Sequence, residues 1–190
     1  MNKLSRIIIL LASVILLIMF ICPIWSISLE APQYPEGLGL NIHINTITGH
    51  KPNDLQSING LNHYIGMKTI EPSSITELKI MPYVIGFMML FGLIILLLNK
   101  KYLIWIWIAV FIIIAIVGLY DFYLWGFDYG HNLSPHAIIK IPGMYYQPPV
   151  FGSKQLLNFT AHSYPYIGGI AAFLSIVLSL VGLIFEGKKK

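Results

Sequence analysis

Charged side chains are scarce in this chain of 190 residues. They make up 11% of it, whereas hydrophobic residues make up 56%. Soluble globular domains carry about 25% charged residues. The composition therefore excludes an ordinary soluble domain and predicts an integral membrane protein.

Cysteine is almost absent, because Cys22 is the only one in the chain. A single cysteine excludes an internal disulfide and a haem attached through a CxxCH motif. The motifs of P-loop proteins, dinucleotide-binding folds, zinc peptidases and serine hydrolases are absent as well. We therefore do not expect the chain to be an enzyme in its own right.

Charge is also absent from the interior of four long apolar runs. Each run is close to the roughly 20 residues that a helix needs to cross about 30 Å of hydrocarbon. The lack of charge within them argues against a proton-coupled or ion-coupled transporter, whose pathway usually needs such groups. The four runs are Ile7–Trp25, Met81–Leu98, Tyr102–Tyr120 and Tyr166–Phe185.

These runs divide the chain into spans and loops. The first span is expected to stay attached as a signal anchor. The alternative is a cleaved signal peptide with Ser26–Ser28 as the cleavage site, which would leave three spans. The predicted parts are spans at 1–25, 81–98, 102–120 and 166–185, long loops at 26–80 and 121–165, a turn at 99–101 and a tail at 186–190.

Basic residues predict the orientation, because cytoplasmic flanks retain Lys and Arg. Seven of the twelve lie in the N-terminal flank, the 99–101 turn and the C-terminal tail. Both termini should therefore be cytoplasmic, with both long loops on the outer side. Those loops hold five basic and seven acidic residues, so their formal charge is 5 − 7 = −2. The sequence pI of about 9.1 thus reflects membrane orientation and does not imply nucleic-acid binding.

The two long loops contain signals of regular structure. In the first loop, residues 40–48 alternate apolar and polar side chains, which indicates a short strand. Residues 54–68 repeat apolar residues at helical spacing after Asn53 or Asp54 as the cap, which predicts an amphipathic helix. The second loop begins with an aromatic belt and continues with four prolines, so it should be extended or irregular. We predict an all-α polytopic membrane protein with four transmembrane helices, whose two ordered extracytoplasmic loops pack into a cap that includes at most a short strand pair.

Small residues form a stripe along the fourth span at three- and four-residue spacing. Such a stripe lets helix backbones approach closely in lipid. It fits ordinary packing within the bundle, and it also fits contact with a partner protein. The stripe consists of Gly168, Ala171, Ala172, Ser175, Ser179 and Gly182.

All six histidines lie in the two long loops, and two groups of them stand near methionine. His63 and Met67 are four residues apart on the predicted helix, so they should project from one face. An imidazole with a thioether suits copper, especially Cu(I). The alternative is a structural histidine beside a packing methionine. His43, His50 and His162 are weaker candidates, because a strand face, a turn and the interface are ordinary places for histidine.

The second group is His131, His136 and Met144 in the Pro-rich loop. An extended loop can fold two imidazoles and a sulfur onto one ion. The alternative is that His131 caps a turn, His136 binds backbone and Met144 fills a gap. The sequence therefore predicts a copper site made from some subset of His63, Met67, His131, His136 and Met144.

Three stretches carry a family resemblance: Ala31-Pro-Gln-Tyr-Pro-Glu-Gly-Leu-Gly39, Asn59-Gly-Leu-Asn-His-Tyr-Ile-Gly-Met67 and Pro142-Gly-Met144. They resemble small four-span membrane proteins, the NosB-like group, that are encoded beside the clade II type of nitrous oxide reductase. The resemblance implies a bacterial inner-membrane protein whose loops face the periplasm. It also implies a role in copper delivery or in electron transfer to that multicopper enzyme. It supplies no residue roles.

The sequence-based hypothesis is a non-enzymatic accessory protein for a periplasmic metalloenzyme that binds or hands over copper. Its expected partners are the lipid bilayer and a periplasmic or membrane protein, and no nucleic acid. The main alternative is a structural, assembly or electron-transfer-supporting subunit of a membrane respiratory complex without a metal of its own. A third class is a pore or carrier for a small neutral solute, which only the uncharged spans favour.

Overall fold

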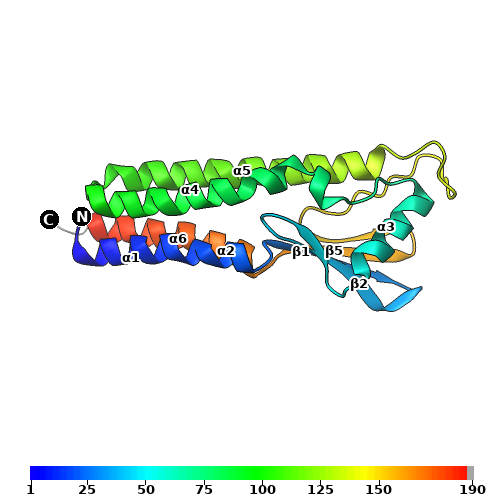
Figure 1. The fold of residues 1–190 in the computed structure, drawn as a ribbon, viewed down its shortest axis with the longest axis horizontal. Coiled ribbons are helices and arrows are strands. Elements are labelled where there is room, and N and C mark those ends of the chain that lie inside the picture. Colours follow the sequence, from blue (N-terminus) through cyan, green and yellow to red (C-terminus); the bar gives the residue numbers. More distant parts are fainter. Residues whose placement is uncertain (188–190) are drawn as a thin grey trace.

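Four long helices dominate the computed structural model, which describes residues 1–187. The first is built from α1 (Lys3–Val14), the 3-10 turn η1 (Ile15–Leu17) and α2 (Ile18–Ile21). The others are α4 (Thr76–Leu98), α5 (Tyr102–His131) and α6 (Ile167–Gly187). All four are long and apolar enough to cross a membrane. The prediction of four spanning-length helices is therefore confirmed (Figure 1).

Two helix ends differ from the predicted bounds. The first helix stops at Ile21, because Cys22 is already extended (φ −104°, ψ 148°) and Pro23 disfavours helical geometry in the residue before it. Helix α5 instead continues beyond Tyr120 to His131. The aromatic belt that we assigned to a loop is thus the final part of a long helix, which extends past the bundle (Figure 1).

A five-stranded antiparallel sheet stands at one end of the bundle, so the prediction of an all-α fold is wrong. The strands follow the order β3-β2-β1-β5-β4. Their extended backbone comes from both long loops, including the second loop, which we expected to be extended or irregular and which contributes two paired strands. The strands are β1 (Trp25–Ala31), β2 (Tyr34–Ile42), β3 (Ile47–Gly49), β4 (Gly152–Leu156) and β5 (Phe159–Pro165).

The central strand β1 joins the two loops. Ile27 pairs with Leu40 of β2 on one side and with Ser163 of β5 on the other. The two loops therefore pack together as predicted, but through a continuous ladder of backbone hydrogen bonds. The predicted strand at 40–48 falls across the end of β2 and the start of β3, which pair as a hairpin.

Helix α3 (Asp54–Ile65) covers one face of this sheet and confirms most of the predicted helix at 54–68. It ends at Gly66, whose left-handed backbone (φ 81°) is the usual way to close a helix. Beneath α3, Ile58 packs with Ile27, Leu40 and Tyr129 in one buried apolar cluster. A 3-10 turn, η2 (Pro72–Ser74), then leads into α4.

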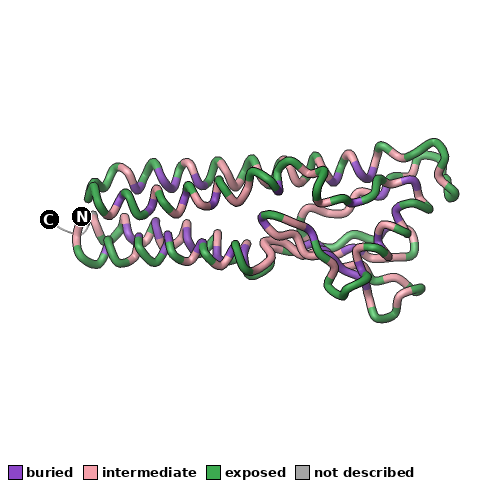
Figure 2. Tube along the Cα trace, viewed as in Figure 1, coloured by how far each residue is buried: buried purple, intermediate pink, exposed green. Residues whose placement is uncertain are grey.

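The helices of the bundle pack through their inner faces, where the buried residues are found (Figure 2). The small-residue stripe of α6 packs there: Ala171, Ser175 and Ser179 are at most 3% exposed. The hydroxyl of Ser175 donates to the carbonyl of Ala12 in α1 at 2.5 Å. Packing within the bundle, one of the two interpretations of the stripe, is therefore confirmed.

The start of α1 and the end of α6 meet at the end of the bundle away from the sheet (Figure 1). There the N-terminal amino group lies 3.6 Å from a carboxylate oxygen of Glu186. The backbone amide of Asn2 donates to the same side chain at 2.6 Å. The molecule thus has one end formed by the start of α1, the end of α6 and the α4–α5 turn, and an opposite end formed by the sheet and α3, which we call the cap.

Candidate functional site

His63 and Met67 do not share a helical face. Helix α3 ends at Ile65, and the left-handed Gly66 turns the chain before Met67. His63 is exposed on the helix, whereas Met67 is half-buried against the apolar cluster beneath the sheet. The predicted spacing of four residues therefore does not place the imidazole and the thioether one turn apart.

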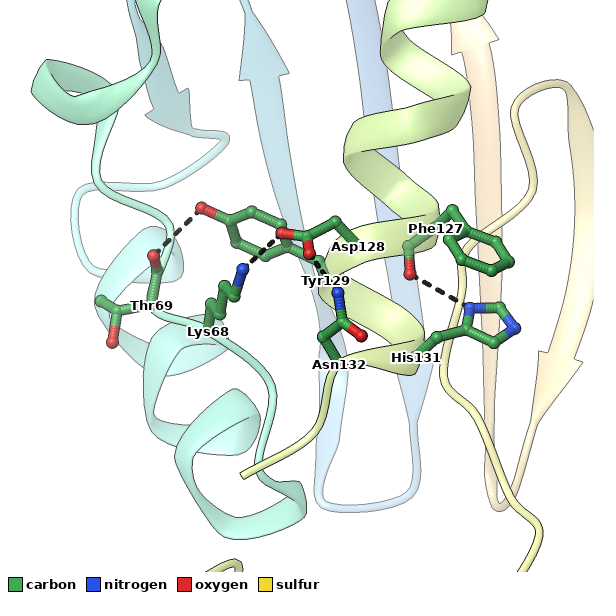
Figure 3. Close-up of polar contacts among 7 residues, drawn as sticks. All are labelled: Lys68, Thr69, Phe127, Asp128, Tyr129, His131 and Asn132. Atoms are coloured by element: carbon green, nitrogen blue, oxygen red, sulfur yellow. Dashed lines mark hydrogen bonds and ion pairs between the residues drawn. The ribbon is translucent and has the colours of Figure 1, made fainter. Parts of the chain in front are cut away.

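His131 is the last residue of α5, and its ring lies between two aromatic rings. The ring centroids are 4.0 Å from Phe127 and 4.6 Å from Tyr145, with nearly parallel planes. Its Nδ1 donates to the carbonyl of Phe127 at 3.1 Å, as Figure 3 shows. In the neutral imidazole this bond leaves Nε2 as the nitrogen with a free lone pair.

His136 and Met144 lie in the loop after α5, and this loop runs beside the end of α3. The amide of Ser134 donates to the carbonyl of Gly66 at 2.8 Å, and the amide of Ile139 donates to the carbonyl of Tyr64 at 2.9 Å. His136 is exposed and Met144 is half-buried. The segment that carries His136 therefore lies beside the segment that carries His63 and Met67.

Neighbouring backbones do not by themselves make a metal site. Within residues 1–187 there is no group of three or more His, Cys, Asp or Glu side chains that could hold a metal ion. Methionine sulfur fits Cu(I) as a ligand, so a site of imidazole and thioether donors stays a prediction. The structure places residues 134–139 beside the end of α3, and it does not determine which side chains would bind copper.

A group of polar contacts fixes the end of α5 to the segment after α3 (Figure 3). The ammonium of Lys68 lies 2.5 Å from the carboxylate of Asp128, and the hydroxyl of Tyr129 donates to the carbonyl of Thr69 at 3.3 Å. The side-chain amide of Asn132 donates to the other oxygen of Asp128. An ion pair this exposed contributes little to stability, so its main effect is to set the position of α5 against the cap.

A cavity of about 500 Å³ lies where the bundle meets the sheet. Its walls come from α2, α4, α5 and α6, and its roof comes from β1, the end of β2 and the start of β3. We call it the junction cavity. Apolar side chains form most of its surface, among them Met19, Ile85, Phe111, Ile114, Phe173 and Ile176.

Three titratable side chains line the junction cavity on its cap side: His43, Glu77 and Asp121. Glu77 lies in the first turn of α4, and its charge interacts with that of Asp121 on the neighbouring helix. Partial burial lowers the pKa of His43 below the ordinary value of 6.5, which favours the neutral ring. Nε2 of that ring is 3.3 Å from the hydroxyl of Thr48.

Sequence reasoning did not identify these three residues as a group. The available signal was position: Glu77 comes shortly before the second predicted span and Asp121 directly after the third. Adjacent antiparallel helices place such ends at one level, so both carboxyl groups should reach the same boundary. His43 reaches the cavity only because of the sheet, and no feature of the sequence indicated that position.

The fold defines a class of protein: a membrane protein with four spanning-length helices and an antiparallel sheet at one end of the bundle. Comparisons with known proteins add no family to this description. No family model, no curated protein and no solved structure matches the chain. The resemblance to the NosB-like group therefore stays a prediction.

Proposed function

We propose that this protein binds a membrane-soluble amphiphile with a cationic head in the junction cavity. The supporting observation is the cavity itself, which is lined almost entirely by apolar groups and has two carboxyl groups at one side. A concave apolar pocket with a few polar groups is the usual form of a small-molecule site. The function is binding or presentation of the ligand, without chemical conversion.

The shape of the lining fits an apolar tail. Along α5 the cavity is bordered from Phe111 to Trp125, which at 1.5 Å per residue corresponds to about 21 Å of helix. Phe111 lies among the buried residues of the bundle core, whereas Trp125 contributes to the cap. A ligand from the bilayer would therefore place its tail between the helices and its head beneath the sheet.

The charges on the cap side select the head group. Among the described residues that line the cavity, Glu77 and Asp121 are the charged ones, and none is Lys or Arg. Two neighbouring carboxylates repel each other, and they would also repel an anionic head. A cationic head is attracted to both carboxylates and reduces the repulsion between them. The neutral ring of His43 adds a hydrogen-bonding group without opposing charge.

A series of probes with one chain length and three head groups tests this proposal. Dodecylamine, dodecanol and dodecanoic acid are offered to the purified protein in a neutral detergent, and bound ligand is counted by native mass spectrometry. We expect one equivalent of the amine, less of the alcohol and least of the acid. Glu77→Gln and Asp121→Asn should reduce the preference for the amine.

Glu71→Gln provides the matched control, because Glu71 is an exposed carboxylate that does not line the cavity. This variant should keep the amine preference of the unmodified chain. The proposal is wrong if all three probes bind equally well, or if Glu71→Gln weakens amine binding as much as Glu77→Gln does.

A second candidate function is the copper-binding accessory role predicted from the sequence. The observation that favours it is the pair of backbone hydrogen bonds between residues 134–139 and the end of α3, which brings His136 near the segment of His63 and Met67. Neutral imidazole and thioether ligands would hold Cu(I) without carboxylate charge. A partner metalloenzyme, nitrous oxide reductase by the resemblance, would take the ion by ligand exchange.

Copper retention tests the second candidate. The purified protein is loaded with Cu(I), desalted and assayed for bound copper beside the double variant His63→Ala and Met144→Ala. His162→Gln, a substitution on the sheet, is the control and should retain copper. Equal copper in the unmodified chain and the double variant would remove this candidate. Co-purification of a stable respiratory complex from such variants would instead favour the structural subunit.

A further inference from the structure

A second cavity, of about 370 Å³, lies inside the cap. One wall is the apolar face of the sheet, with Ile27 of β1 and Leu40 of β2, and the opposite wall is α3 with Ile58 and Leu61. The end of α5 and the loop at 139–148 complete the enclosure. We call this space the cap cavity.

Two hydrogen-bond donors at this cavity have no protein partner. Tyr146 is only 2% exposed, and its hydroxyl makes no hydrogen bond within residues 1–187. The same holds in the described chain for the buried indole Nε1 of Trp125. Both side chains line the cap cavity. Buried donors are normally satisfied, so a group that accepts hydrogen bonds is expected at this place.

The position of Tyr146 is fixed by its backbone. Its amide donates to the carbonyl of Gly130 in α5 at 2.9 Å. The adjacent Gln147 backbone lies so close to Gly130 that a Cβ there would be 2.4 Å from the Gln147 nitrogen. The backbone of Tyr146 is therefore fixed against the helix end, and its side chain, 2% exposed, is enclosed by the surrounding residues.

The cap cavity differs from the junction cavity in its charge. None of the described residues lining it is Asp, Glu, Lys, Arg or His, and its polar side chains are amides, phenols and one indole. A charged ligand would find no counter-charge there and would lose its hydration. The indole N–H can only donate, and the phenol can donate as well. The ligand must therefore be neutral and carry an acceptor.

We propose that the cap cavity is a second binding site, for a neutral apolar molecule with a carbonyl or ether oxygen that accepts a hydrogen bond from the Tyr146 hydroxyl. The walls supply the apolar contact, and the Tyr146 hydroxyl orients the oxygen. The ligand of this site differs from that of the junction cavity, because the cap cavity favours a neutral molecule that accepts a hydrogen bond and the junction cavity favours a cation. Trp125 lines both cavities, so Tyr146 is the residue that tests this site alone.

Photolabelling with benzophenone, a neutral aromatic ketone, tests the proposal. The full-length purified protein is irradiated with the probe, and the adducts are located by peptide mass spectrometry. We expect adducts on α3 and on Met67, which line the cavity. Dicyclohexyl ketone and dicyclohexylmethane, which differ by one oxygen, then serve as competitors. The ketone should compete better by roughly 2- to 12-fold, the range that one neutral hydrogen bond gives.

Tyr146→Phe removes the donor and keeps the ring, so it should abolish most of the ketone's advantage while adducts still form. Tyr145→Phe is the matched control, because this exposed neighbour does not line the cavity. Equal competition by the two compounds in the unmodified protein would overturn the proposal. So would an unchanged ketone advantage in Tyr146→Phe, or adducts confined to residues that do not line the cap cavity.

Discussion

Asp54 shows how one buried carboxylate can hold the cap together. The side chain is 4% exposed, and its Oδ2 accepts hydrogen bonds from the amides of Gly39 at 3.1 Å and Lys51 at 3.2 Å. Gly39 belongs to β2 and Asp54 begins α3, so this oxygen connects the helix to the sheet that it covers. The contact explains the position of α3 better than the weak apolar stripe of the helix does.

Asp54→Ala should destabilise the cap, because it leaves the buried amide of Gly39 and the partly buried amide of Lys51 without an acceptor. The expected loss is about 1–3 kcal/mol in the free energy of unfolding. Hydrogen exchange measures it, and the amides of Gly39 and Lys51 should exchange faster. Asp54→Asn is the control that keeps an oxygen acceptor, and it should lose less. Equal protection in Asp54→Ala and the unmodified protein would contradict the assignment.

His43 makes stability depend on pH in a defined direction. Burial lowers the pKa of its ring in the folded protein below the ordinary 6.5, while the unfolded chain keeps the ordinary value. As the pH falls below about 6.5, the unfolded chain therefore binds a proton that the folded chain binds less readily. The free energy of unfolding should decrease on acidification through this range.

Thermal unfolding at pH 7.5 and pH 5.5 measures this effect. The midpoint should fall more in the unmodified protein than in His43→Gln, which cannot titrate at this position. Glu77 and Asp121 also line the same cavity, so Glu77→Gln and Asp121→Asn are compared to separate their titration from that of His43. An identical acid response in His43→Gln would show that the ring does not contribute.

Among the helices, α5 depends on one glycine where the loop at 145–148 crosses it. A Cβ at Gly130 would lie 2.4 Å from the nitrogen and 2.5 Å from the Cα of Gln147. Because these are backbone atoms, they cannot move aside as a flexible side chain would. Gly130→Ala should push the loop away, break the bond from the Tyr146 amide, and cost about 1–3 kcal/mol.

Gly118→Ala is the control within the same helix, since its nearest neighbour would be a methionine methyl carbon at 4.0 Å. It should unfold like the unmodified protein. Hydrogen exchange of the Tyr146 amide, together with the unfolding midpoint, compares the two variants. The packing argument fails if Gly130→Ala keeps both values.

The elements that could be predicted are those with a local pattern. The four long helices follow from uninterrupted apolar runs, and α3 follows from helical spacing after a polar cap. The sheet was missed because its signal is divided between distant segments. β1 does alternate Ile27 and Leu29 with polar residues, but it follows a transmembrane run directly. β5 turns the small residues Ala161 and Ser163 inward, which gives little apolar signal.

The candidate site was harder to predict than the fold, for a related reason. Helical spacing alone placed His63 beside Met67, but the helix ends between them at Gly66. The stacking of His131 on Phe127 required α5 to continue beyond the apolar run, which composition did not indicate. Glu77, Asp121 and His43 line one cavity only because the start of α4, residue 121 within α5 and the turn after β2 lie at one level. Such a meeting follows from tertiary arrangement and leaves no local pattern.

Taken as a whole, the molecule has two ends that should lie on opposite sides of a membrane. The start of α1, the end of α6 and the α4–α5 turn form one end, and the cap forms the other (Figure 1). Basic residues are concentrated at the first end, so we expect that end in the cytoplasm. The bacterial inner membrane and the periplasmic position of the cap are what the resemblance to the NosB-like group implies, and they stay predictions.

Single-cysteine labelling tests this topology. In a Cys22→Ser background, Ser73→Cys and Asn158→Cys place exposed thiols in the cap, and Lys101→Cys places one at the other end. A membrane-impermeant maleimide added to intact spheroplasts should label both cap positions. Position 101 should react only after permeabilisation. Labelling of position 101 from outside would contradict the orientation.

The position of β1 at the centre of the sheet sets the order in which the strands can pair during synthesis. Strands β1 and β2 are adjacent in sequence and can pair as soon as they have emerged. The other edge of β1 stays unpaired until β5 has been synthesised, because Ile27 of β1 pairs with Ser163 of β5, which is close to the end of the chain. Distant pairing of this kind slows folding. Until the last strand arrives, the exposed edge of β1 is open to pairing with other chains.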